Sequence, residues 1–95
     1  MSAEAIQREQ SDTKGRYSLT LDGHTAELTY SRAGTTRIII DHTGVPAALA
    51  GRGAGKALVQ RAVEDARAEG VRIVALCRFA KAQIEKHPEW QDVLA

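Results

Sequence analysis

With 95 residues, the chain is long enough for one small domain and too short for a multi-domain protein. Hydrophobic residues make up 43% and charged residues 26%, which is ordinary for a soluble globular protein. The 13 Lys and Arg residues nearly balance the 12 Asp and Glu residues, so the net charge of +1 argues against a nucleic-acid-binding protein. No apolar run approaches the roughly 20 residues of a membrane span, and we expect no membrane partner.

The first residues of the chain are polar and lack the apolar centre of a secretory signal. We therefore predict a flexible N-terminal leader over 1–15, followed by a single domain over 16–95. Cys77 is the only cysteine, so no internal disulfide can form. A small domain without disulfides is typical of a reducing compartment, and we expect a cytoplasmic location.

The first half of the domain shows the two-residue alternation of strands that bury one face. One strand is predicted around Tyr17–Leu21 and another around Ala26–Tyr30, joined at Asp22-Gly23, a strong signal for a tight hairpin. A third strand is predicted over 35–43, where the run Ile38-Ile39-Ile40 indicates burial on both faces. These segments predict a three-stranded antiparallel meander.

The second half changes to the spacing of a helix. From Gly53 to Glu69 the apolar residues follow in steps of one, three and four, which indicates one buried helix face. Gly70 suits a left-handed helix end, and a short apolar strand is predicted over 71–77. A strand, a helix and a strand in this order form a parallel pair with a right-handed crossover. With a further helix over 79–86, the prediction is an α+β fold: a mixed sheet in which the antiparallel meander precedes a β-α-β crossover and a C-terminal helix.

A glycine-rich loop lies between the third predicted strand and the first helix. Gly53 and Gly55 allow the backbone to approach a ligand closely, and free N–H groups at a helix start suit an anion such as pyrophosphate. Arg52 and Lys56 add positive charge to this loop. The loop is therefore the first candidate for a binding site.

Two common phosphate loops do not fit this segment. A Walker A loop needs glycine at Ala50 and a hydroxyl at Ala57, and a dinucleotide loop needs glycine at Lys56 or Leu58. Gly53-Ala54-Gly55 does fit the G-x-G part of the acyl-CoA loop Q/R-x-x-G-x-G/A. A nucleotide-phosphate binder unrelated to CoA remains an alternative.

Several segments in a fixed order resemble a known family. Over about 17–94 the sequence resembles the short, single-domain branch of the GNAT acetyltransferase superfamily. The segments that carry the resemblance are Asp41-His42-Thr43, Val45-Pro46, Leu49 to Val59, Ala66-Arg67, Gly70, Leu76-Cys77, Phe79 and His87 to Trp90.

The resemblance implies that acetyl-CoA is the cosubstrate and lies in a cleft where the strands 35–43 and 71–77 part. It implies that the pantetheine arm pairs with backbone around Thr43 to Val45, and that Phe79 packs against it unless Phe79 belongs to the core. The pyrophosphate is implied to lie on the N–H groups of the loop, those of Arg52, Gly53, Ala54, Gly55, Lys56 and Ala57. Ala50 stands where the family has Arg or Gln, and we expect weaker or differently balanced CoA binding as a result, rather than none.

Two residues are candidates for the chemistry. Cys77 ends the second cleft strand, where a thiol can protonate the CoA thiolate, accept the acetyl group covalently, or simply pack as a small apolar side chain. In the family a cysteine at this position is a proposed active-site residue. His42 ends the neighbouring strand, where an imidazole can act as general base, orient Cys77, or hydrogen-bond the strand end. The scattered histidines have no zinc-ligand spacing, so we expect no metal.

We therefore predict an acetyl-CoA-dependent N-acetyltransferase that transfers acetyl to an amine on a protein or a small molecule. The alternative is a non-catalytic acyl-CoA-binding or interaction module with the same fold. The sequence names no acceptor, and we expect a monomer or a weak homodimer.

Overall fold

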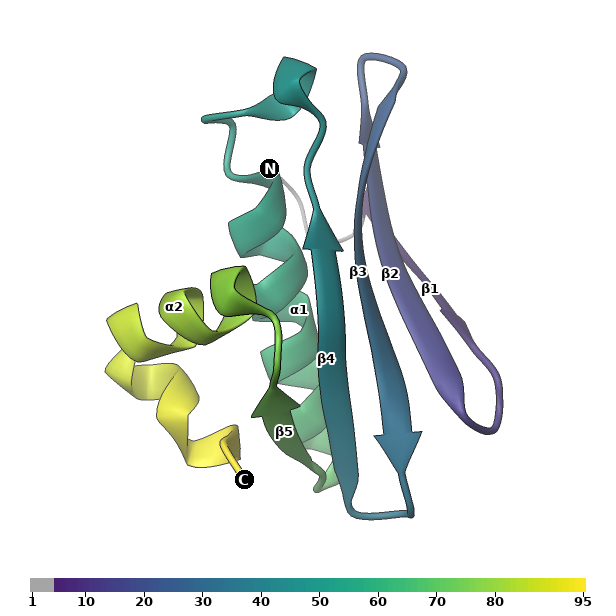
Figure 1. Ribbon diagram of the computed structural model, residues 1–95, viewed down its shortest axis with the longest axis vertical. Helices are drawn as coiled ribbons and strands as arrows, with labels where there is room; N and C mark the ends of the chain where they lie inside the picture. Colours follow the sequence, from purple (N-terminus) through teal and green to yellow (C-terminus); the bar gives the residue numbers. More distant parts are fainter. Residues whose placement is uncertain (1–4) are drawn as a thin grey trace.

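The computed structural model describes residues 5–95 and contains a five-stranded sheet in the order β1-β2-β3-β4-β5 (Figure 1). The first four strands run antiparallel to their neighbours, and β5 runs parallel to β4. The strands are β1 (Ile6–Gln10), β2 (Lys14–Leu21), β3 (His24–Ala33), β4 (Arg37–Gly44) and β5 (Arg72–Ala75). The helices are α1 (Ala54–Glu69) and α2 (Arg78–Lys86), with 3-10 turns at Ala47–Leu49 and Pro88–Val93. The α+β class and the parallel crossover pair are as predicted.

Helix α1 covers one face of the sheet, and the core lies between them (Figure 1). The helix ends at Gly70, whose φ of 71° gives the predicted left-handed cap. Its apolar stripe is buried as the spacing predicts, and it comprises Leu58, Val59, Ala62, Val63 and Ala66. Each fully buried Leu or Val side chain of this stripe contributes about 1.5–3 kcal/mol to stability.

The opposite face of the sheet carries no helix, which corrects one prediction. Ile38 and Ile40 are buried, but Ile39, which points the other way, is only half-buried. Helix α2 packs beside the β5 edge against α1 rather than over that face (Figure 1). We call the uncovered surface of β1 to β5 the open face.

The predicted leader over 1–15 is wrong for the residues that the structure describes. Ile6–Gln10 forms β1, which pairs with β2 and extends the expected three-stranded meander to four strands. Ile6 is buried, and Arg8 donates hydrogen bonds to the Tyr30 hydroxyl and to Asp65 on α1. The residues of this strand are mostly polar, so the sequence pattern does not predict it. Its inward-facing side chain, Arg8, is charged, and its hydrogen-bond partners lie far away in the sequence. The leader residues 1–4 lie outside the described part of the chain.

Two glycine-dependent features complete the sheet. The Asp22-Gly23 hairpin has positive φ at both residues, 51° and 78°, as a tight turn between right-twisted strands requires. In β2, a Cβ on Gly15 would lie 2.0 Å from Cζ of Tyr30, so only glycine leaves room for that buried ring.

Within residues 5–95, no helix is long and apolar enough to cross a membrane.

Candidate active site

The two parallel strands separate at one end of the sheet. Their register ends at the pair Ile40 and Ala75, after which β4 continues to Gly44 and the other chain turns into α2. The N–H groups of Leu76 and Cys77 both donate to the carbonyl of Ile40, each at 3.2 Å. Beyond this point β4 is paired with β3 on one side only, and we call the separation between β4 and the start of α2 the opening.

A β-bulge in β4 lies directly beside this opening. Tyr30 pairs with Ile40 and Thr29 pairs with His42, so Asp41 is an extra residue in β4. The bulge shifts the alternation of side chains by one position. His42 therefore shares the open face with Thr29, whereas Thr43 faces α1.

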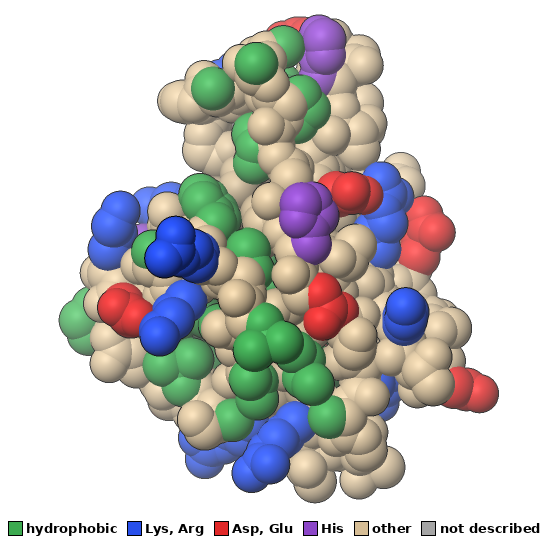
Figure 2. Space-filling view, viewed as in Figure 1, with side chains coloured by type: hydrophobic (Ala, Val, Ile, Leu, Met, Phe, Trp, Pro, Cys, Tyr) green, Lys and Arg blue, Asp and Glu red, His purple; other side chains and the backbone are tan. Residues whose placement is uncertain are grey.

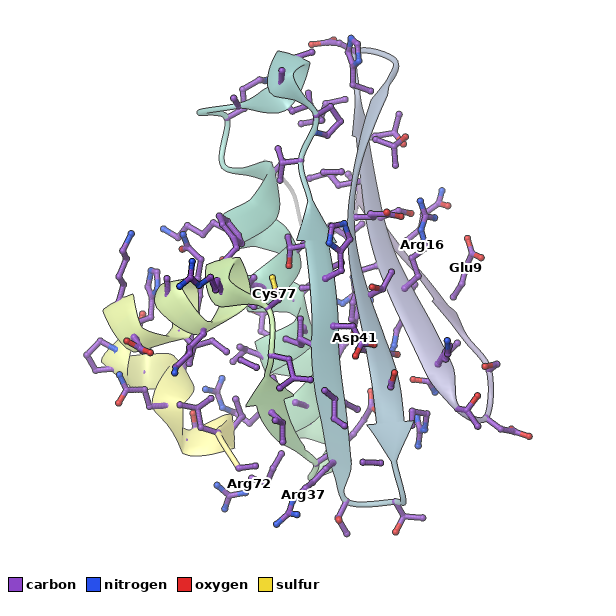
Figure 3. All side chains as sticks on the ribbon, viewed as in Figure 1. Glu9, Arg16, Arg37, Asp41, Arg72 and Cys77 are labelled. Atoms are coloured by element: carbon purple, nitrogen blue, oxygen red, sulfur yellow. The ribbon has the colours of Figure 1, made fainter. Side chains whose placement is uncertain are left out.

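Cys77 lies at the opening, as the sequence predicts, and is partly buried (Figure 3). Its Sγ donates a hydrogen bond to Thr43 Oγ1 at 3.5 Å. Cys77 is also the N-cap residue of α2, where the helix dipole favours a negative charge. Thr43 and Cys77, 34 positions apart in the sequence, thus meet across the opening.

The surroundings of the thiol favour its ionised form. Burial raises the pKa of the Cys77 thiol, because a charged sulfur loses its hydration. Hydrogen bonds to the thiolate outweigh that effect, and they come from the Thr43 hydroxyl and from backbone N–H groups of Ala80, Phe79 and Thr43. The net result is a pKa below the ordinary value of a thiol, which makes Cys77 a better nucleophile at neutral pH.

Within residues 5–95, no hydrogen bond joins His42 to Cys77, so the contacts do not support the predicted role of His42 in orienting the thiol. The histidine is exposed on the open face, and the hydrogen-bond partner of the thiol is Thr43. A Cβ on Gly44 would lie 2.9 Å from His42 Nε2, so the glycine leaves room for the imidazole beside the strand. The imidazole and the thiol thus belong to two sides of β4.

The glycine loop supplies free N–H groups at the same end of the sheet. Gly53 is the N-cap of α1 with φ 79°, and no side chain caps this helix. Arg52 N–H donates to Leu49 and Ala57 N–H donates to Gly53, so these two predicted donors are already used. Within residues 5–95, the N–H groups of 53–56 have no acceptor, which narrows the predicted anion cradle to Gly53, Ala54, Gly55 and Lys56.

A groove of about 330 Å³ lies between this loop and α2. Val45, Lys56 and Phe79 line it, and Val45 and Phe79 are large hydrophobic side chains with 37% and 38% of their surfaces exposed. A Cβ on Gly55 would lie 2.6 Å from Cζ of Phe79, so the glycine lets the aromatic ring lie against the first turn of α1. Phe79 is therefore a groove residue and not a core residue. An apolar wall beside free N–H groups suits a ligand with an aliphatic arm and an anionic end.

The Arg52 side chain forms an ion pair with a residue outside the groove. Its guanidinium donates to Asp22 Oδ2 at 2.6 Å, which ties the loop to the β2–β3 hairpin. The cation that remains on the groove is Lys56. Sequence reasoning missed this ion pair, because the two residues are 30 positions apart.

Other parts of the site were also missed. Gln83 of α2 lines the groove, and the Thr43 hydroxyl holds the thiol, but neither residue stands in a motif. The resemblance implies a role for the Thr43 backbone, and the structure adds a contact from its hydroxyl. Within residues 5–95, no group of three or more His, Cys, Asp or Glu side chains gathers as a metal site would require.

Comparisons with known proteins agree with this geometry. Residues 16–93 match the family model described as GCN5-related N-acetyl-transferase. An NMR solution structure of a GCN5-like protein from Staphylococcus aureus, proposed to be an N-acetyltransferase, is 37% identical in sequence and superposes with a TM-score of 0.70. The match covers 96% of this chain and 89% of that one. No curated protein matches the chain.

The family model spans the sheet from β2 onward, both helices, the glycine loop and the opening that holds Cys77. The chain belongs to the GCN5-related N-acetyl-transferase family.

Proposed function

We propose that this protein transfers the acetyl group of acetyl-CoA to an amine. The observation that carries the proposal is the opening beyond Ile40, where the uncapped N-terminus of α1 and the Cys77 thiol lie at the same end of the sheet. The family contributes acetyl transfer as the general activity. The donor, the acceptor and the residue roles below are inferred from the contacts.

The groove supports CoA as the carrier of the acetyl group. The free N–H groups of 53–56, at the positive end of the α1 dipole, match a pyrophosphate, and Lys56 adds one charge. Val45 and Phe79 provide an apolar wall for an aliphatic pantetheine arm. The strand residues beyond Ile40, unpaired on the β5 side, offer backbone groups for the amides of that arm.

The chemistry divides between the two sides of β4. A neutral amine forms a C–N bond to the thioester carbonyl, the C–S bond breaks, and the CoA sulfur and the proton of the amine leave. In this proposal His42, exposed on the open face, accepts the proton from the incoming amine. In this proposal Cys77, hydrogen-bonded to Thr43, either protonates the departing CoA sulfur or carries the acetyl group from CoA to the amine.

One observation favours a second candidate, a CoA-binding module without turnover. Ala50 replaces the Arg or Gln of the acyl-CoA loop, and Arg52 is paired with Asp22, so the loop offers less positive charge than its sequence indicates. Such a module would bind CoA and acetyl-CoA equally and release no thiol.

Calorimetric titration of the full chain with CoA, acetyl-CoA and ATP tests whether CoA is the carrier of the acetyl group. A thiol-release assay with small amines and lysine peptides then tests transfer. We expect heat with both CoA species, none with ATP, and thiol release with an amine acceptor. Binding without release over the whole acceptor panel would favour the module, and an absence of heat with both CoA species would reject both candidates.

A further inference from the structure

We infer that the open face of the sheet is a docking site for an extended, lysine-bearing peptide, which makes a polypeptide the acceptor class. This inference rests on the proposed function. A groove of about 800 Å³ crosses the open face from Glu9 on β1 to Asp41 on β4. In Figure 3, Glu9, Arg16 and Asp41 follow one another across the sheet, and Cys77 lies just beyond β4.

The Asp41 end of the groove selects a cation. The Asp41 carboxylate accepts one hydrogen bond, from Ser31 Oγ at 2.7 Å, and within residues 5–95 it has no cationic partner. The bulge places Asp41 next to His42, at the edge of the opening. A lysine ammonium drawn to this carboxylate therefore arrives beside His42, the proposed base.

At the other end of the groove, Glu9 provides a second carboxylate, which has only a long contact to a cation. Its side chain is 74% exposed, and its contact to Arg16 is long, at 3.9 Å. Arg16 is itself neutralised by Glu27, to which its Nε donates at 2.7 Å. Glu9 can therefore accept a second cation from a ligand without breaking a strong pair.

The remaining lining favours a peptide over a polyamine. Thr29 and Ser31 present hydroxyl groups, and Lys14, whose ammonium has no ion-pair partner within residues 5–95, presents a positive charge. Figure 2 shows side chains of both charges over this part of the face. A peptide has both donors and acceptors to match such a lining, whereas a protonated polyamine has donors only.

The width of the sheet sets the spacing of the ligand's charges. From β1 to β4 there are three intervals of about 4.8 Å, or roughly 14 Å. An extended peptide covers that span in about four residues, at about 3.3 Å each. The preferred acceptor therefore carries a basic residue about four positions from the acetylated lysine.

The test uses terminally blocked peptides with one acceptor lysine and an arginine four positions away. Titrated into the ¹⁵N-labelled full chain without CoA, they should shift the amide signals of Thr29, Ser31 and Asp41. The variant Asp41→Asn should bind about fivefold more weakly, as expected for an exposed charge pair. Asp12→Asn, the same change on an exposed residue in the β1–β2 turn, is the matched control and should bind as the wild type does.

Shifts confined to another surface, equal affinity of the Asp41 and Asp12 variants, or tighter binding of spermidine than of the peptide would each overturn the inference. Replacing the arginine of the peptide by glutamine should also weaken binding, and no change would count against the second cation site. CoA titration of the same samples separates the two proposals. Peptide binding at the groove without CoA binding would reject only the proposal that CoA carries the acetyl group. CoA binding without peptide-induced amide shifts would reject only the proposed peptide site.

Discussion

A single extra residue in β4 decides which side chains face the opening. Without the bulge at Asp41, the alternation from Ile38 and Ile40 would bury His42 against α1 and turn Thr43 outward. With it, Thr43 reaches the thiol of Cys77 and His42 stays on the open face. The proposed acid or nucleophile and the proposed base are thereby separated by one strand.

Replacing Cys77 by alanine tests the role of the thiol. We expect Cys77→Ala to bind CoA as the wild type does and to lose most acetyl transfer, because the side chain lines the opening without touching the glycine loop. Calorimetry and the thiol-release assay measure the two effects separately. Unchanged turnover would return Cys77 to a packing role.

The contact between Thr43 and Cys77 makes a prediction about pH. The pKa of the thiol lies below its ordinary value, so its alkylation by iodoacetamide should reach half-maximal rate at a lower pH than that of a free cysteine. Thr43→Val removes one hydrogen bond to the thiolate and should move that midpoint to higher pH. Thr20→Val, a change of the same kind on β2, is the control. Identical profiles for both variants would show that the hydroxyl does not stabilise the thiolate.

The functional end of helix α1 depends on its glycine cap. Gly53 adopts a left-handed conformation that an L side chain rarely takes, and this conformation leaves its own N–H and the next three without acceptors. The sequence predicts free N–H groups at this helix start, because the glycine-rich segment lies between a strand and a helix. It did not predict that the flanking Arg52 and Ala57 N–H groups would be used within the fold.

Two valine substitutions separate binding from stability. Gly53→Val and Gly34→Val both place a side chain at positive φ, 79° and 67°, with nothing within 4 Å of the new Cβ. Each should lower the free energy of unfolding by about 1–2 kcal/mol. Only Gly53→Val should abolish CoA binding, because Gly34 lies in the distant β3–β4 turn. Thermal unfolding and calorimetry provide the comparison, and retained affinity in Gly53→Val would place the phosphates elsewhere.

At the scale of the whole molecule, a polar network holds the antiparallel strands to α1. The Tyr17 hydroxyl donates to Asp65 Oδ2 at 2.7 Å, and Arg8 donates to the same oxygen at 3.3 Å. The guanidinium of Arg8 also lies over the rings of Tyr17 and Tyr30, at 5.3 and 5.8 Å from their centroids. In a small domain with one covered sheet face, these contacts supplement a limited apolar core.

Tyr17 should limit stability at alkaline pH. Burial, reinforced by the hydrogen bond to Asp65, raises the pKa of Tyr17 well above its ordinary value. Above about pH 10 the unfolded chain therefore releases the phenolic proton while the folded chain keeps it, and stability falls as pH rises. Tyr17→Phe should lose about 1 kcal/mol near neutral pH and show a shallower decline above pH 10. Denaturant unfolding across this range measures both, and equal slopes for the two proteins would contradict the assignment.

Local sequence patterns determine much of the secondary structure of this protein. The alternation in β2 and β3, the Asp22-Gly23 turn, the helical spacing of α1 and its Gly70 cap are properties of neighbouring residues, so the sequence alone predicts them. The Cys77 position and the glycine loop followed from short motifs in order. The family resemblance rests on the same motifs, so it depends on the sequence and not on the fold.

Tertiary structure decided the rest, because the remaining features join residues far apart in the chain. Strand β1 exists because Arg8 finds partners on β3 and α1, and Ile39 is half-exposed because only one face of the sheet is covered. The bulge that brings Thr43 to Cys77 is set by the register of β3 against β4. The groove across the open face exists only once four strands lie side by side, and no single segment encodes it.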